Sequence, residues 1–300
     1  MKKKTYLFAL MAMALTLGSC SDNENGIGGE TSKYITVSTS IGNMTRVATD
    51  EKGGQTFEEG DEISVYAWTG APTVAPETSE RVVNNAINKL TNGSWISTPQ
   101  MLWKNNREKH YFIGVYPTAA ISDLSAGEYT FDANKQTESD LLVAVNPDGL
   151  SYSADAQQTV PLTFTHVMAK LAVNLTYKNQ WGGIPTVEKV VVGNAAKEAT
   201  INYLTKVVTP STTAKEDFSL PEITENTKYV SVIIPQEDVK QLTIVIGGKN
   251  FVYDNGTPFK LESGKITTVN LEVGRDEIKL GDVKITDWEN GSTFSGEALN

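Results

Sequence analysis

Apolar and polar residues alternate along much of this 300-residue chain, which is the pattern of half-buried β-strands. The clearest case is a stretch near the middle, residues 160–175, here called the central stretch. Its apolar positions fall on every second residue on both sides of His166: Val160, Leu162 and Phe164 before it, and Leu171, Val173 and Leu175 after it. This pattern predicts one long strand, or two strands joined by a kink, where one β-layer passes to the next.

Shorter runs of the same kind recur between turn signals, while long segments of helical period are scarce. Strands are predicted at 33–41, 109–117, 140–145, 187–192, 200–204, 229–234, 242–246, 251–253, 265–273 and 283–285. Residues 79–90 fit either a short amphipathic helix or a strand leading into the hairpin signal Asn92-Gly93. Pro147-Asp148-Gly149 predicts a turn that ends the strand before it.

Many short strands with regular turns indicate an all-β protein built of sandwiches or partly open barrels. A chain of 300 residues is long enough for two domains, each with its own core. The simplest division places an N-terminal sandwich at 47–167 and a C-terminal sandwich at 168–300, with the boundary inside the central stretch.

Charge and residue counts exclude several functions. The formal net charge is −10, and it becomes −13 if Lys2, Lys3 and Lys4 are removed with a signal peptide, so nucleic acid is a poor partner. The single cysteine, Cys20, excludes an intramolecular disulfide. No Walker loop, Gly-x-Gly-x-x-Gly, zinc pattern or Gly-x-Ser-x-Gly elbow occurs, so we expect no enzyme, no metal and no cofactor. His166 is predicted to be buried and hydrogen-bonded.

The N-terminus has the features of an export signal. Residues 1–19 combine a basic start with the apolar run 5–17, which is too short to span a bilayer. The run ends in Leu17-Gly18-Ser19-Cys20, which resembles a bacterial lipobox and predicts acylation of Cys20. Residues 20–46 are then a lipidated tether followed by the first predicted strand.

Two further features have alternative interpretations. Arg46 is the only basic residue between Lys33 and Lys52, and it lies in a polar loop. It is either a solvated loop arginine or, at the Arg46-Val47 bond, a cleavage site for a trypsin-like protease. The five tryptophans could stack on sugars if they are exposed, but such residues more often fill cores.

Several segments together resemble the fimbrillin family (the Mfa-like group), the type V pilins of Gram-negative anaerobes. They are the lipobox with the acidic residues after it, Phe57 to Tyr66, Tyr111 to Pro117, Asp140 to Ala144, Leu162 to Leu171, Gly264 to Thr267, and Ile285 to Trp288. The resemblance spans nearly the whole chain. It implies two tandem β-sandwich domains of the transthyretin-like, Greek-key type.

The resemblance also implies a mechanism and a location. Such a pilin reaches the outer membrane through lipid on Cys20, and a protease then cuts after a basic residue, here at Arg46-Val47. The cut releases the strand 33–41, whose Ile35, Val37 and Ile41 fill a groove, and a strand of another subunit takes its place. The donor strand is expected in the C-terminal region, with Val283, Ile285, Phe294 and Leu299 as its apolar positions.

The expected partners are therefore other fimbrial subunits, identical or different, together with the outer membrane. The filament would serve adhesion to host or bacterial surface ligands. The alternative is a surface lipoprotein that stays anchored and binds glycan or protein as a monomer. A glycan-cleaving enzyme is a third class, which requires two carboxylates facing each other across a cleft.

Overall fold

The structure, a computed structural model, describes residues 33–42, 56–152, 159–254 and 256–288. Within these residues lie nineteen strands and two short 3-10 helices, η1 (Thr78–Glu80) and η2 (Asn179–Trp181). The prediction of an all-β protein is confirmed. The strands form four sheets, of seven, five, four and three strands.

The seven-stranded sheet contains all but one of the strands before residue 167, in the order β1-β8-β7-β5-β2-β3-β4. Its members are β1 (Thr36–Ile41), β2 (Glu62–Thr69), β3 (Val83–Thr91), β4 (Ser94–Thr98), β5 (His110–Tyr116), β7 (Leu142–Leu150) and β8 (Thr159–His166). β1 lies at one edge and pairs with β8 in parallel, whereas every other neighbouring pair in this sheet is antiparallel.

This sheet curls until its two ends approach each other. The backbone N–H of Ile35 donates to the carbonyl of Met101 at 2.9 Å, just beyond the end of β4. The indole Nε1 of Trp95 on β4 donates to Thr39 Oγ1 on β1 at 3.0 Å. β1 is therefore paired with β8 along one side, while on the other side Trp95 bonds to Thr39 and the residues directly before β1 bond to the chain beyond β4.

The other three sheets belong mainly to the second half of the chain. The five-stranded sheet has the order β14-β15-β9-β18-β19, the four-stranded sheet β13-β10-β16-β17, and the three-stranded sheet β12-β11-β6. Their strands are β6 (Gly127–Thr130), β9 (Ala169–Tyr177), β10 (Val187–Ala196), β11 (Glu198–Asn202), β12 (Val207–Pro210), β13 (Lys215–Ser219), β14 (Glu222–Thr224), β15 (Lys228–Ile233), β16 (Gln241–Ile246), β17 (Lys249–Asp254), β18 (Lys265–Val273) and β19 (Ile278–Asp287).

The central stretch passes from one sheet to another. β8 ends at His166 in the seven-stranded sheet, and β9 begins at Ala169 in the five-stranded sheet. The two residues between them, Val167 and Met168, are fully buried. The prediction of two strands joined by a kink is thus the form that the structure adopts, while a domain boundary at residue 168 stays a prediction.

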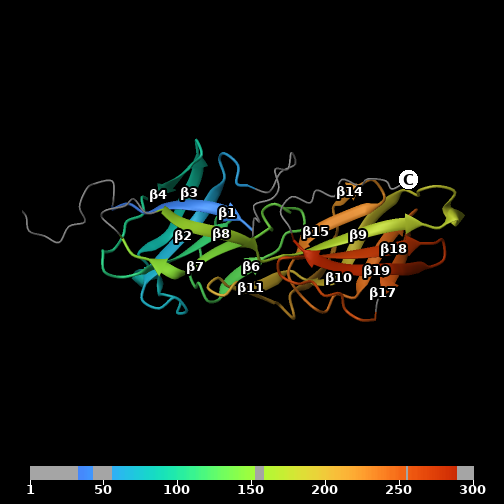
Figure 1. Cartoon of the computed structure of the whole chain (residues 1–300). Coiled ribbons are helices and arrows are strands. Elements are labelled where there is room, and N and C mark those ends of the chain that lie inside the picture. The colour runs from blue at the N-terminus through green and yellow to red at the C-terminus, as the bar shows by residue number, and fades with distance from the viewer. Residues whose placement is uncertain (1–32, 43–55, 153–158, 255, 289–300) are drawn as a thin grey trace, which may run out of the picture.

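The two halves of the chain share a hydrophobic core. In the elongated molecule, β6 and β11 lie side by side between the two groups of sheets, and β6 comes from the first half of the chain and β11 from the second (Figure 1). Phe131, directly after β6, packs against Phe218 of β13 with ring centroids 5.0 Å apart. Its backbone N–H donates to the carbonyl of Lys197 at 2.8 Å.

One hairpin forms as its sequence predicts. Residues 83–91 are a strand rather than a helix, and Asn92 and Gly93 follow it with φ angles of 50° and 72°. Two successive positive φ angles are those of a type I′ turn, whose twist matches the flanking strands. The ambiguity of 79–90 is therefore resolved in favour of the hairpin.

The turn predicted at Pro147-Asp148-Gly149 is wrong, because β7 continues to Leu150. The three residues form an irregularity opposite Tyr111, where the register with β5 shifts between His110 and Phe112. Gly149 has a φ of 66°, and a Cβ there would lie 2.8 Å from the Tyr111 ring. Turn residues here provide a bulge within a strand, which a local sequence pattern does not distinguish from a chain reversal.

The shared core predicts that Phe131→Ala destabilises both halves together. Phe131 is 1% exposed, and truncation of a buried phenylalanine costs about 3–5 kcal/mol. We expect segment-resolved hydrogen exchange to show faster global exchange in β5 and in β18 alike. Ile96→Ala, at a site 54% exposed, is the control and leaves both rates near those of the wild type. Faster exchange confined to one half would contradict a shared core.

Candidate functional site

The strand predicted to fill a groove, β1, is buried on one face. Ile35, Val37 and Ile41 are 2%, 6% and 8% exposed. They belong to a hydrophobic cluster that also contains Phe112, Leu162 and Phe164. On the other face, Thr36 and Ser40 form hydroxyl contacts of 3.2 Å with Thr159 and Thr163 of β8.

This geometry makes β1 one of the two edge strands of the sheet. It has one strand neighbour, and the register runs from Thr36 opposite Thr159 to Ile41 opposite Phe164. Loss of β1 would expose the apolar surface that Ile35, Val37 and Ile41 cover, at about 1.5–3 kcal/mol for each buried side chain. A replacement strand with the same alternation would recover that energy.

The second predicted element, the C-terminal strand, lies at an edge of a different sheet. β19 is the edge of the five-stranded sheet and pairs with β18 from Lys265 opposite Asp287 to Val273 opposite Ile278. Val283 and Ile285 share a face with the buried Val269 and Thr267, yet they remain 38% and 39% exposed. The sandwich therefore covers this strand only partly.

The end of β19 is held by an aromatic residue. Trp288, which is 8% exposed, stacks on His166 with ring centroids 3.9 Å apart, and Lys170 Nζ lies 4.1 Å from its ring centre. His166 Nδ1 lies 2.7 Å from Asp140 Oδ1, so the predicted buried, hydrogen-bonded histidine is confirmed. Burial lowers the pKa of Lys170, and the carboxylate of Asp140 opposes this shift.

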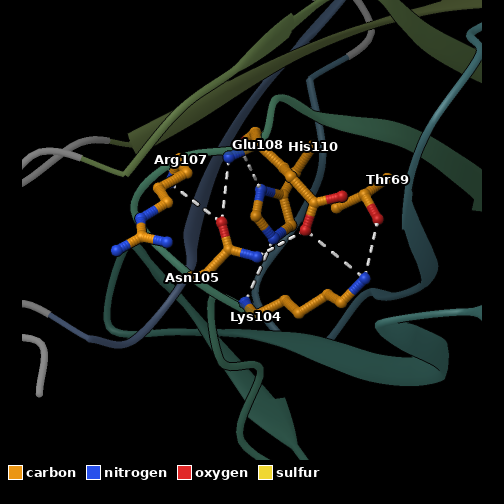
Figure 2. A network of polar contacts seen from close by, with 6 residues as sticks. All are labelled: Thr69, Lys104, Asn105, Arg107, Glu108 and His110. Carbon is orange, nitrogen blue, oxygen red and sulfur yellow. Dashed lines mark hydrogen bonds and ion pairs between the residues drawn. The ribbon is translucent and has the colours of Figure 1, made fainter. Parts of the chain in front are cut away.

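A separate polar network surrounds the other histidine, His110 (Figure 2). The backbone N–H of Lys104 donates to His110 Nε2 at 3.0 Å, so the ring proton is on Nδ1, which donates to the Glu108 carbonyl at 3.1 Å. Asn105 Oδ1 accepts the backbone N–H groups of Arg107 and Glu108, both at 2.9 Å. The network fixes the loop that leads into β5, and nothing in its arrangement brings a nucleophile to the histidine.

Several predicted site residues cannot be compared with the structure. Cys20, Arg46, Val47, Phe294 and Leu299 lie outside the described residues. Among the residues that are described, no three or more His, Cys, Asp or Glu side chains are grouped to hold a metal ion. The described helices include none long and apolar enough to cross a bilayer.

The five tryptophans are mostly core residues, as the commoner of the two interpretations predicted. Trp68, Trp103 and Trp288 are 2%, 4% and 8% exposed. Trp95 and Trp181 are half-buried. The role of Trp288 as the anchor of the last strand was not predicted, because it depends on a contact with a residue far away in the sequence.

The fold has close counterparts among solved structures. A candidate cell adhesion protein from Bacteroides uniformis is 17% identical, with a TM-score of 0.65 over 85% of this chain and 99% of that one. A candidate cell adhesion protein from Bacteroides ovatus is 18% identical, with a TM-score of 0.62 over 85% and 98%. A fimbrial protein from Bacteroides vulgatus is 12% identical, with a TM-score of 0.52 over 84% and 99%.

At these identities the structural matches establish the fold alone. No curated protein sequence matches the chain. The model of the fimbrillin-like family matches residues 45–288, which is most of the chain. This protein belongs to the fimbrillin-like family, and membership supports a role as a fimbrial subunit.

The His110 network predicts a loss of stability in acid. Burial lowers the pKa of His110 below its ordinary value of 6.5. The imidazole of His110 therefore binds a proton more readily in the unfolded chain than in the folded one. The contribution of neutral His110 to folding stability is present above pH 6.5 and is lost as the pH falls through the lower pKa of the folded state.

His110→Gln tests this dependence through urea unfolding at a series of pH values. We expect the variant to be less stable than the wild type at pH 8 by about 1–3 kcal/mol, because two buried hydrogen bonds change. The difference in unfolding free energy should shrink towards pH 5, because only the wild type is destabilised there by the lowered pKa of a buried imidazole. A difference that stays constant with pH would contradict the assignment.

Proposed function

We propose that this chain is a structural subunit of a cell-surface fimbria that assembles by exchange of its first strand after proteolysis. The observation that carries the proposal is the position of β1, an edge strand with one strand neighbour, whose Val37 and Ile41 are buried together with Ile35 directly before it. Membership in the fimbrillin-like family supports the fimbrial role.

In this proposal the covalent link between β1 and the rest of the sheet is cut at Arg46-Val47, between β1 and β2 in the sequence. Once cut, β1 is retained by non-covalent contacts alone, chiefly its backbone pairing with β8 and the burial of Ile35, Val37 and Ile41. An incoming strand then competes for the same backbone groups and the same apolar positions.

The donor strand is proposed to come from the C-terminal region that includes Val283, Ile285, Phe294 and Leu299. Val283 and Ile285 are more than a third exposed in β19, so their removal from their own sheet costs less apolar burial than removal of a core strand would. Trp288 opposes that removal, because its indole would lose the stacking contact with His166.

Export and attachment complete the proposal. Cys20 is acylated after the signal peptide is removed, and lipid on this residue anchors the subunit at the outer membrane before assembly. Residues 47–167 and 168–300 serve as the two domains of the subunit. The core that they share suits a filament component, because such a core transmits force from one end of the molecule to the other.

Processing of the native protein tests the proposal. We expect mass spectrometry of the subunit taken from assembled filaments to show an N-terminus at Val47. Arg46→Ala should keep residues 33–46 on the chain and abolish heat-labile ladders on a gel. Lys52→Ala, which removes the next basic residue in the sequence, is the matched control and should assemble normally.

The contrary result is a native chain that begins at acylated Cys20, carries an intact Arg46 and forms no ladder. That result would exclude assembly by strand exchange. The protein would then be the anchored monomeric binder that is the alternative to a polymerising subunit.

A further inference from the structure

A groove runs between β1 and β4, the two edge strands that approach each other as the seven-stranded sheet curls. Its volume is about 710 Å³, within the range of small-molecule sites. Trp95 and Phe57 contribute the aromatic part of its lining, and their rings meet edge to face at 5.3 Å. Both side chains are half-buried, so part of each remains accessible.

The side chains that line the groove are uncharged and rich in hydroxyl groups. None of the fourteen residues that line the groove is charged, although 21% of the chain is Asp, Glu, Lys or Arg. Half of them carry a hydroxyl group: Thr36, Ser38, Thr39, Ser40, Thr56, Ser94 and Thr159. Four of these hydroxyls already form hydrogen bonds within the protein: Thr36 with Thr159, Ser40 with Thr163, and Thr39 with the Trp95 indole. A hydroxyl can both donate and accept, so this uncharged lining with its aromatic rings is still complementary to a carbohydrate.

An added β-strand is the alternative occupant of the groove. Such a strand would need continuous free backbone edges on β1 or β4. The N–H of Ile35 is already bonded to Met101, and Trp103 donates to the Lys33 carbonyl at 3.2 Å. The bond from Trp95 Nε1 to Thr39 Oγ1 joins the two walls of the groove. These bonds favour a compact ligand over an extended peptide.

We propose that the groove between β1 and β4 binds a neutral oligosaccharide, with Trp95 as the stacking surface and the Ser and Thr hydroxyls as hydrogen-bond partners. The inference does not depend on strand exchange, because it rests on the intact subunit. The six residues Thr36–Ile41 all line the groove, so one wall is lost if β1 leaves. Glycan binding therefore belongs to the uncut subunit, and removal of β1 should abolish it.

The test uses the full exported chain without its lipid and with Arg46 uncut, titrated with five probes. Maltotriose, mannotriose and triacetylchitotriose represent neutral sugars, trigalacturonic acid is the anionic comparison, and a hexapeptide of alternating Thr and Val represents a strand. We expect at least one neutral trisaccharide to bind saturably at millimolar concentration or below, and the anionic sugar and the peptide not to bind.

Single substitutions then test whether the sugar binds in the groove. Ser94→Lys places a charge in the groove at an exposed position, and Thr205→Lys does the same in the exposed turn between β11 and β12. We expect the first to weaken binding by about tenfold or more and the second to leave it unchanged. Trp95→Phe, which keeps an aromatic ring but removes the Nε1 bond to Thr39, should also weaken binding.

Three outcomes would overturn the inference. They are no binding of any neutral sugar, binding of the peptide in preference to the sugars, and sugar binding that Ser94→Lys leaves unaffected. Each is independent of whether Arg46 is cleaved in native filaments. Failure of the glycan site and failure of strand exchange can therefore be distinguished.

Discussion

The parallel pairing of β1 with β8 is the contact on which the first half of the molecule depends. It closes the sheet over a core that includes Phe112 and Phe164, yet it joins segments 123 residues apart in the sequence. An edge strand with unpaired backbone groups is a template for other strands. In this chain the edge is partly protected, because the Lys33–Ile35 backbone bonds to Met101 and Trp103 and the Trp95 indole bonds to Thr39.

In contrast to this edge strand, the junction between the two halves of the chain is fixed by several contacts. β6 pairs with β11, Phe131 packs on Phe218, and the Gln136 side chain bonds to Ser231 of β15 at 3.0 Å. These contacts bury a continuous core instead of leaving a linker. The proposed exchange of β1 requires that one edge strand can leave while the rest of the subunit stays folded. The contacts at the junction favour the second part of that requirement.

Local patterns in the sequence were sufficient for the strands themselves. Alternation predicted Ile35, Val37 and Ile41 on one buried face, and Asn92-Gly93 predicted a hairpin. The pairing of β1 with β8 was not predictable, because alternation fixes which face is buried and not which strand lies alongside. The bulge at Gly149, the stacking of Trp288 on His166 and the uncharged groove at Trp95 likewise depend on residues brought together only by the fold.

The central claim is that β1 leaves its place beside β8 during assembly. The most direct test is to link β1 covalently to β8 and measure filament assembly. Ser40 Oγ and Thr163 Oγ1 lie 3.2 Å apart across β1 and β8, so Ser40→Cys with Thr163→Cys can form a disulfide there. The account predicts that the oxidised protein is still cut at Arg46 but forms no filament ladder, and that reduction restores assembly. Ladders of equal length from the oxidised protein would contradict the exchange of β1.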